Sequence, residues 1–307
     1  MRILIVGAGA TGGYFGGRLA EAGRDVTFLV RPARAAALAG RGLRIHSPAG
    51  ESVIPVRTVT AATLDGPYDL IVLAVKSYGL PGAMADLRPA VGPETVIVPL
   101  LNGMRHIDAL TGAFGAAHVY GGVCMIAGTL TGEGDIVQLT GLHRLAFGPL
   151  DGGPEPRLAA VTDALSGAGF DAEGTTTITR QMWEKWLFLA SLGVVTTLMR
   201  SPVGEILAAP GGPAFTERVV AEATAIVTAA GHPPRESALA FLRGSITRAR
   251  DVPTTSSMYR DMQAGLPVEA DAIVGDLVAH ADRLGVDAPL YAAAYTNLSV
   301  YARGRAG

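Results

Sequence analysis

The sequence predicts an α/β fold in which an open parallel sheet occupies the first part of the chain and helices alone occupy the second. Two observations lead to this prediction. In the first half, continuous apolar runs rich in Val, Ile and Leu alternate with helical patterns, and such runs are typical of strands buried on both faces of a parallel sheet. After about residue 175, helical periodicity dominates, and glycine and proline mark the breaks. We therefore predict a sheet domain over residues 1–175 and a helical domain over residues 176–307.

Each expected element follows from a local pattern in the sequence. Four buried strands are indicated by apolar runs of strand length, at residues 2–6, 25–30, 69–75 and 95–100. Two hairpins are indicated by glycine-containing turns between strand-like segments, at residues 43–56 and 119–140, and a short strand follows at 143–147. Helices are indicated by apolar residues at helical spacing, at residues 12–22, 180–198, 213–230, 236–250, 268–284 and 290–302.

Composition and charge exclude several classes of protein. Only 17% of the residues are charged and 49% are hydrophobic, which is typical of a well-packed globular chain. The formal net charge of −2 argues against a nucleic acid or an anionic membrane as the main partner. The longest apolar stretch, residues 186–199, is interrupted by polar residues and is too short to cross a bilayer. We expect a soluble protein that binds a small molecule.

Cysteine and histidine usage limits the chemistry further. The single cysteine, Cys124, excludes an internal disulfide and fits a reducing compartment, so we expect a cytoplasmic protein. The six histidines do not have the spacing of metal ligands, and no bound metal is expected.

A glycine-rich segment, Gly7-Ala8-Gly9-Ala10-Thr11-Gly12, follows the first expected strand and opens a helix. In this context the G-x-G-x-x-G pattern is typical of dinucleotide binding. The first glycine permits a tight turn, the second lets the backbone approach a pyrophosphate, and the third lets the helix pack closely on the strand. The free N–H groups of the helix N-terminus then attract the phosphates. A purely structural glycine turn is the alternative.

The residue after the second strand distinguishes the two nicotinamide cofactors. An enzyme that uses NAD usually carries Asp or Glu there to hold the ribose hydroxyl groups. Here Arg31 follows the strand, Arg34 comes three residues later, and no acid lies between them. Because a cation matches a 2′-phosphate, the sequence favours NADPH. The alternative is a pair of solvated arginines at the start of a helix.

Lysine is scarce, with Lys76 and Lys185 the only two among 25 basic residues. Arginine stays protonated, whereas burial can tune a lysine to donate a proton, so the remaining lysines are candidates for the reaction centre. Lys76 directly follows the strand expected at residues 69–75, and Lys185 opens an apolar helix that carries no charge from residue 186 to 199. The alternative for both lysines is an exposed surface position.

Two further polar residues stand where a ligand is expected. Asn102 follows the strand at residues 95–100, at the carboxyl edge of the sheet, although Asn102-Gly103 is also a common turn pair. Glu269 is expected to share a helix face with Ile273 and Leu277, an unusual place for a carboxylate unless it points into a site. Alternatively, Glu269 complements the helix dipole.

With these residues in place, the sequence resembles the ketopantoate reductase (2-dehydropantoate 2-reductase) family over nearly its whole length. The resemblance implies a Rossmann-type domain followed by a helical substrate domain like the C-terminal domain of 6-phosphogluconate dehydrogenase. It also implies reduction of a 2-keto acid by NADPH, first of all ketopantoate to pantoate in pantothenate biosynthesis. The resemblance is carried by segments that follow one another in the family's order and spacing. They are the glycine loop, Arg31, Val75-Lys76, Leu101-Asn102-Gly103-Met104, Trp183-Glu184-Lys185, Ser256-Ser257-Met258, Asp261 and Glu269-Ala270-Asp271.

The resemblance also implies roles for single residues. By position, Lys185 resembles the general acid that protonates the substrate oxygen, and Glu269 the residue that holds the substrate hydroxyl or the lysine. Ser257 and Asn102 resemble substrate-binding groups, and Lys76 would lie near nicotinamide and substrate. The helical domain would offer a surface for a homodimer.

Two positions depart from the family pattern. Members typically carry asparagine four and eight residues after the general-acid lysine, where this chain has Leu189 and Gly193. Loss of such a side chain should weaken the binding of a substrate that needs its hydrogen bonds by about 1–3 kcal/mol. Either Ser191 or Thr197 compensates, or the substrate is less hydroxylated and more apolar than ketopantoate.

Three hypotheses about function therefore remain. The first is an NADPH-dependent 2-keto acid reductase. The second keeps the fold but changes the substrate, to that of another 2-hydroxy acid dehydrogenase or of an opine-type dehydrogenase that reduces an imine. The third is a non-catalytic regulator that binds NADP(H), which Leu189 and Gly193 keep open.

Overall fold

The structure of the protein is a computed structural model, and it describes residues 1–249 and 253–305. The chain folds into two compact units. The first, here called the sheet unit, comprises Met1–Leu101 and His106–Thr179, and the second, the helical unit, comprises Asn102–Arg105 and Arg180–Gly307. Each unit has its own cluster of buried hydrophobic residues. The domain boundary expected between residues 175 and 176 stays a prediction.

The sheet unit is built on a five-stranded parallel sheet, as the apolar runs predict. Its strands, in spatial order, are β5 (Arg57–Val59), β2 (Asp25–Leu29), β1 (Arg2–Val6), β6 (Tyr68–Leu73) and β7 (Val91–Pro99). The last residues of the four longer strands are in register, because Val6 pairs with both Leu29 and Leu73, and Leu73 pairs with Pro99. The segments that leave these strands therefore start at one edge of the sheet, on either side of the central strand β1, where ligands bind in open α/β sheets.

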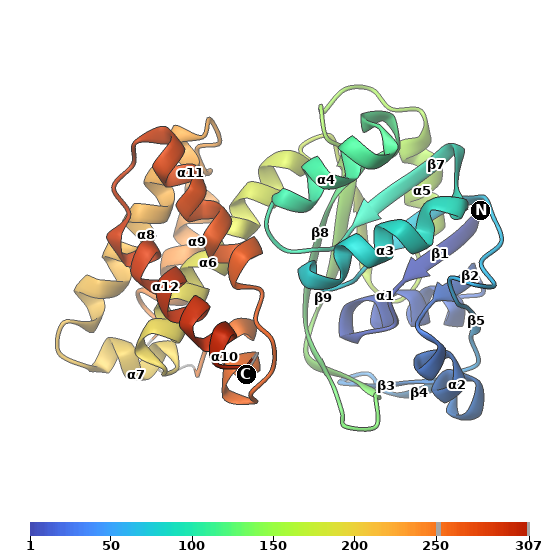
Figure 1. The fold of residues 1–307 in the computed structure, drawn as a ribbon, viewed down its shortest axis with the longest axis horizontal. Helices are drawn as coiled ribbons and strands as arrows, with labels where there is room; N and C mark the ends of the chain where they lie inside the picture. Colours follow the sequence, from blue (N-terminus) through green and yellow to red (C-terminus); the bar gives the residue numbers. More distant parts are fainter. Residues whose placement is uncertain (250–252, 306–307) are drawn as a thin grey trace. The chain divides into compact units, whose positions relative to one another are not determined.

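Helices alternate with the strands along the sheet unit (Figure 1). They are α1 (Ala10–Glu21), α2 (Pro32–Arg41), α3 (Leu80–Leu87), α4 (Arg105–Phe114) and α5 (Arg157–Leu165), with short 3-10 turns at Ser77–Gly79, Arg88–Ala90 and Ala116–His118. The first helix starts two residues before its expected position, and α2 begins one residue after Arg31 because Pro32 suits the first turn of a helix.

A second sheet completes the sheet unit. It contains β10 (Asp171–Gly174), β9 (Ile136–Pro149), β3 (Leu43–Ser47) and β4 (Gly50–Ile54), and β8 (Tyr120–Leu130) pairs antiparallel with β9. The prediction of a separate short strand at residues 143–147 is wrong, because these residues belong to β9, which runs without a break for 14 residues. As a result, β8 and β9 form a long hairpin whose turn lies beside β3 and β4 (Figure 1). We call its turn, residues 131–135, the hairpin tip.

The helical unit is organised around α6 (Ile178–Met199), the apolar helix predicted from residue 180. Its residues Leu187, Ala190 and Val194 are almost completely buried. The other helices are α7 (Val203–Ala208), α8 (Gly212–Ala229), α9 (Glu236–Ile246), α10 (Ser257–Gln263), α11 (Asp276–Leu284) and α12 (Pro289–Gly304) (Figure 1). Within the described residues, no helix combines the length and apolarity needed to cross a bilayer.

Two of the expected helices differ from the observed ones. The helix expected at 236–250 ends at Ile246, and its last expected residue lies outside the described residues. The helix expected at 268–284 starts at residue 270, and its first part is the π-helix η4 (Asp271–Gly275), which continues without a break into α11. Glu269 lies at the start of this helical segment, where its carbonyl accepts from the Ile273 N–H, and it is buried like Ile273 and Leu277. The short helices α7 and α10 were not expected.

Candidate active site

The glycine loop between β1 and α1 has a shape that two of its glycines make possible. Gly7 has a φ of +97°, which is unfavourable for other residues, and its N–H donates to the Leu29 carbonyl at 3.0 Å. A Cβ atom at Gly12 would overlap the Gly7 carbonyl oxygen and approach Ala74 Cβ to 2.8 Å. The turn and the close packing of α1 on β1 thus depend on these positions.

Gly9 has a different environment, because a Cβ atom added there would meet no atom of the described structure within 4 Å. Gly9 precedes α1, which has no acidic residue in its first turn. The first N–H groups of any helix lack acceptors within that helix, so those of Ala10, Thr11 and Gly12 are suited to an anion. Open space over Gly9 beside these donors fits a cofactor pyrophosphate.

Two cationic residues lie at the same carboxyl edge of the sheet. Arg31 follows β2 and is exposed at the start of α2. Lys76 follows β6, likewise exposed, just before the turn Ser77–Gly79. Since β2 and β6 flank β1 in the sheet, both residues leave strands adjacent to the glycine loop.

Asn102 begins the short segment Asn102–Arg105, which belongs to the helical unit. Gly103 has a φ of +80°, and a Cβ atom there would overlap the Ala272 carbonyl oxygen in η4 and lie 3.8 Å from Trp186 Nε1. The segment that follows β7 is therefore packed tightly against the π-helix and against α6. Asn102 is half-buried.

Trp186, the neighbour of Lys185 on α6, lies next to Gly103 of this segment and bonds to the backbone of the π-helix that follows Glu269. Lys185 is half-buried on α6, and the neighbouring Trp186 donates its indole N–H to the Ile273 carbonyl at 2.9 Å. Ile273 in turn donates its backbone N–H to the Glu269 carbonyl at 3.1 Å. Glu269 is only 5% exposed, which is exceptional for a carboxylate in a globular protein. Three segments distant in sequence thus meet around one indole ring.

Ser257 is positioned by its neighbour in the chain. Ser256 caps α10 by accepting from the Tyr259 N–H at 3.0 Å, and its hydroxyl pairs with Thr196 Oγ1 of α6 at 2.8 Å. These bonds hold the first residue of α10, the half-buried Ser257, beside α6. Among the described residues, no group of three or more His, Cys, Asp or Glu side chains could hold a metal ion.

Comparison with known proteins identifies the family. The model of "Ketopantoate reductase PanE/ApbA" matches residues 3–152, and that of its C-terminal domain matches residues 177–302. The chain belongs to the ketopantoate reductase family. It is therefore an NADP-dependent oxidoreductase that acts on CH–OH groups, and its fold is the Rossmann-like domain with a helical C-terminal domain that the sequence predicts.

Individual relatives match over nearly the full chain. The "uncharacterized oxidoreductase YkpB" of Bacillus subtilis is 36% identical over 98% of this chain and 99% of the relative. The 2-dehydropantoate 2-reductase of Mesorhizobium japonicum is 30% identical over 89% of each chain. The crystal structure of the 2-dehydropantoate 2-reductase from Methylococcus capsulatus is 28% identical, covers 100% of this chain and 98% of its own, and has a TM-score of 0.87.

The two positions where the resemblance predicts asparagine carry no hydrogen-bonding side chain. Lys185, Leu189 and Gly193 are spaced four residues apart and so share one face of α6. A Cβ atom at Gly193 would overlap Met258 Cε, so the buried Met258 side chain occupies the space that a longer residue would need. Leu189, half-buried, lies between the lysine and this contact.

Neither of the hydroxyl residues considered as substitutes for the asparagines is available. Ser191 is completely buried and pairs with Tyr291 Oη at 3.1 Å. Thr197, also completely buried, donates to the Gly193 carbonyl at 2.7 Å. Both hydroxyl groups already have partners in the core. The prediction that one of them takes over the hydrogen bonds of the missing asparagines is therefore wrong.

An ion pair next to Lys185 was not expected from the sequence. Glu184 accepts bonds from Arg235 Nε at 2.9 Å, from Nη2 at 2.5 Å and from the Arg235 backbone N–H at 3.0 Å. Beside it, the Trp183 ring stacks on His232, with centroids 4.3 Å apart. These contacts anchor the part of α6 that carries the lysine to the segment before α9. Because the partners lie about fifty residues apart, no local pattern could have indicated them.

Proposed function

We propose that this chain reduces a 2-keto acid to the corresponding 2-hydroxy acid with NADPH, and that 2-dehydropantoate is the first candidate substrate. The observation that carries the proposal is the single half-buried lysine of α6, Lys185, in the same compact unit as Asn102, Ser257 and the buried Glu269. Relatives named as 2-dehydropantoate 2-reductases support the substrate.

Lys185 is the proposed general acid. When bound, NADPH supplies the hydride that the carbonyl carbon of the substrate accepts. The Lys185 ammonium then gives a proton to the carbonyl oxygen, so the ketone becomes a hydroxyl group and the lysine is left neutral until it is reprotonated. A buried carboxylate such as Glu269 can orient either the ammonium or the new hydroxyl group by accepting a hydrogen bond.

The remaining residues bind rather than react. Asn102 and Ser257 supply neutral hydrogen-bonding groups for the substrate, and Lys76 supplies a cation for its carboxylate or for the cofactor. In the cofactor site, the N–H groups at Ala10, Thr11 and Gly12 suit the pyrophosphate, with Gly7 and Gly9 shaping the loop, and Arg31 suits the 2′-phosphate.

A second candidate substrate, a 2-keto acid with an apolar side chain, is favoured by Leu189 and by the Met258 side chain over Gly193. A substrate hydroxyl group buried against these atoms would lose its bonds to water without gaining a partner, which costs about 1–3 kcal/mol. A matched pair of substrates separates the two candidates. Ketopantoate and 3,3-dimethyl-2-oxobutanoate differ only in the terminal hydroxyl group.

The test is NADPH consumption with a panel of 2-keto acids that includes this pair, repeated with NADH. We expect turnover of at least one keto acid and a preference for NADPH. Tight NADPH binding with no turnover of any keto acid would contradict the proposal and favour a regulator. Turnover that needs an added amine would instead indicate reduction of an imine.

A further inference from the structure

We propose that Arg34 is a second phosphate-binding residue of the cofactor site, held between the glycine loop and the hairpin tip, and that it distinguishes NADPH from NADH. The inference rests on the use of NADPH and not on the identity of the keto acid. It concerns the sheet unit alone.

Arg34 lies against the glycine loop. It is in the first turn of α2, three residues after Arg31, and its Nε and Nη2 atoms donate to the Ala8 carbonyl at 3.3 and 3.1 Å. Ala8 stands between Gly7 and Gly9, in the loop that follows β1. The guanidinium is thus placed where β1 and β2 end side by side, the position of the adenosine ribose in dinucleotide-binding folds.

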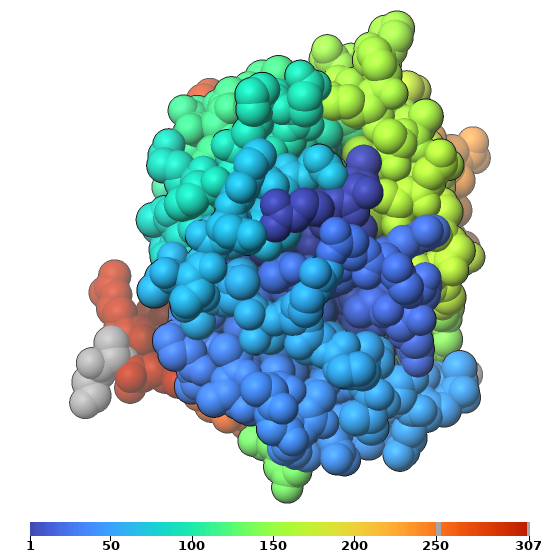
Figure 2. Space-filling model, turned by 90° about the vertical axis from the view of Figure 1, so that its right-hand side faces the viewer, coloured from blue at the N-terminus to red at the C-terminus, as the bar shows by residue number. Residues whose placement is uncertain are grey.

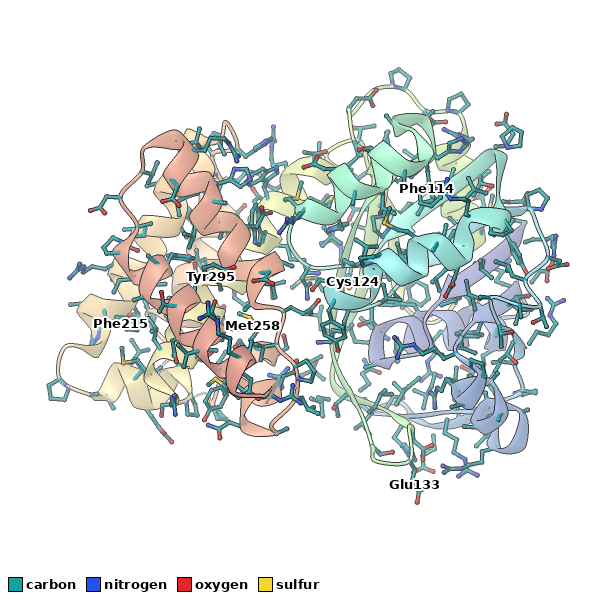
Figure 3. The ribbon with its side chains drawn as sticks, viewed as in Figure 1. Phe114, Cys124, Glu133, Phe215, Met258 and Tyr295 are labelled. Carbon is teal, nitrogen blue, oxygen red and sulfur yellow. The ribbon has the colours of Figure 1, made fainter. Side chains whose placement is uncertain are left out.

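The hairpin tip covers the other side of the guanidinium. Gly134 has a φ of +85°, and a Cβ atom there would lie only 2.5 Å from Arg34 Nη1, so any larger residue would displace the arginine. Arg41 fastens the tip to α2 by ion pairs with Glu133 at 2.7 Å and Asp135 at 3.3 Å. Figure 3 labels Glu133 on this tip, and Figure 2 shows the tip in green at the lower edge, next to the blue surface of the N-terminal residues.

The charge of Arg34 lacks a direct counter-ion within the described part of the chain. No carboxylate oxygen there lies within 4.0 Å of it, and its hydrogen bonds go to one neutral carbonyl. Burial lowers the pKa of the Arg34 guanidinium, and the nearby Arg41 acts in the same direction while Asp135 opposes it. Arg41, by contrast, is neutralised by two carboxylates.

A half-buried, pre-positioned cation of this kind is stabilised by an incoming anion. The pyrophosphate has its own donors at the start of α1, so the anion that suits Arg34 is the 2′-phosphate on the ribose. The exposed Arg31, three residues earlier in the chain, would bind the same phosphate together with Arg34. A purely supporting role, in which Arg34 only holds the Ala8 carbonyl, is the alternative.

Direct binding measurements separate the two roles without any keto acid. We expect Arg34→Ala to weaken the binding of NADPH and of adenosine 2′-monophosphate by about tenfold to a hundredfold, the usual range for a charge-assisted hydrogen bond. The binding of NADH should weaken by less than about twofold. Arg57→Ala is the control, since it removes an exposed arginine of the sheet unit that pairs with Asp25 and not with the glycine loop or the hairpin tip. It should leave the ratio of NADPH to NADH affinity unchanged.

Two further variants guard against a folding defect. Arg34→Lys keeps the charge but loses the planar fork, and should give an intermediate loss of NADPH affinity. Gly134→Ala should displace the guanidinium and lower NADPH affinity more than NADH affinity. An equal loss of NADPH and NADH in these variants would assign Arg34 to loop support and overturn the proposal, as would unchanged NADPH affinity. Failure of every keto acid in the activity assay would leave these binding results unaffected.

Discussion

The sheet unit and the helical unit build their sites from different parts of the chain. In the sheet unit, backbone atoms dominate: a turn with a positive φ at Gly7, an open approach over Gly9 and the first N–H groups of α1. In the helical unit, side chains dominate, and they come from segments at residues 102–105, 185–193 and 257–273. One site depends on local backbone geometry and the other on contacts between distant segments.

This difference teaches where each site is sensitive to substitution. A backbone site tolerates changes of chemistry as long as space and φ are preserved, so its critical positions are small residues. A side-chain site depends on one functional group at each position, so a substitution of equal size or charge can abolish it. The following variants test this contrast, in order of decreasing expected effect.

The largest effect is expected for Lys185→Arg in the helical unit. The positive charge is retained, but arginine cannot donate its proton near neutral pH, so turnover should fall by about a hundredfold to ten-thousandfold. NADPH affinity should stay within about twofold, because the cofactor loop is built from other residues. Steady-state kinetics and a fluorescence titration measure the two quantities. Turnover at the unmodified rate would show that Lys185 is structural.

The backbone site is tested by the pair Gly12→Ala and Gly9→Ala. At Gly12 the added methyl group overlaps the Gly7 carbonyl, so the free energy of unfolding should fall by about 1–3 kcal/mol and NADPH binding should be lost. At Gly9 the methyl group meets nothing within 4 Å, so stability should change by less than about 0.5 kcal/mol while NADPH affinity still drops. Urea denaturation and NADPH titration are the measurements. Unchanged binding in Gly9→Ala would exclude this loop as the pyrophosphate site.

A smaller effect is expected for Leu189→Asn, which restores a hydrogen-bonding group on the Lys185 face of α6. The ratio of kcat/KM for ketopantoate over 3,3-dimethyl-2-oxobutanoate should rise by an amount equal to about 1–3 kcal/mol. Leu189→Ala is the control, because it removes the same apolar bulk without adding a polar group. If both variants change the ratio equally, Leu189 acts through size alone.

The smallest effect concerns pH and His232. Burial lowers the pKa of His232 from its ordinary value of 6.5, and the nearby His280 lowers it further. The unfolded chain therefore binds this proton at a higher pH than the folded chain, so stability falls as the pH drops through 6.5 towards the folded pKa. His232→Phe keeps a ring against Trp183 and should flatten this loss as the pH falls below 6.5. An unchanged pH dependence of thermal unfolding would assign the loss to other groups.

The two units also differed in how far the sequence predicted them. The runs ending at Val6 and Leu29 and the glycine loop between β1 and α1 were all indicated by local patterns, because strand hydrophobicity and turn geometry are short-range properties. By contrast, α10 depends on the bond between Ser256 and Thr196, sixty residues apart. The π-helix at Asp271–Gly275 is likewise supported by Trp186 from α6, so its residues alone resemble an ordinary helix.

The sequence by itself determined the fold class, the family and the cofactor, because these depend on periodicity, on glycines with special backbone geometry and on a cation after β2. Only the tertiary structure grouped Asn102 with the helical unit, brought Met258 over Gly193 and enclosed Arg34 beneath Gly134. Each of these contacts joins residues that lie far apart in the chain. Their meeting depends on how helices and strands pack, which no local pattern encodes.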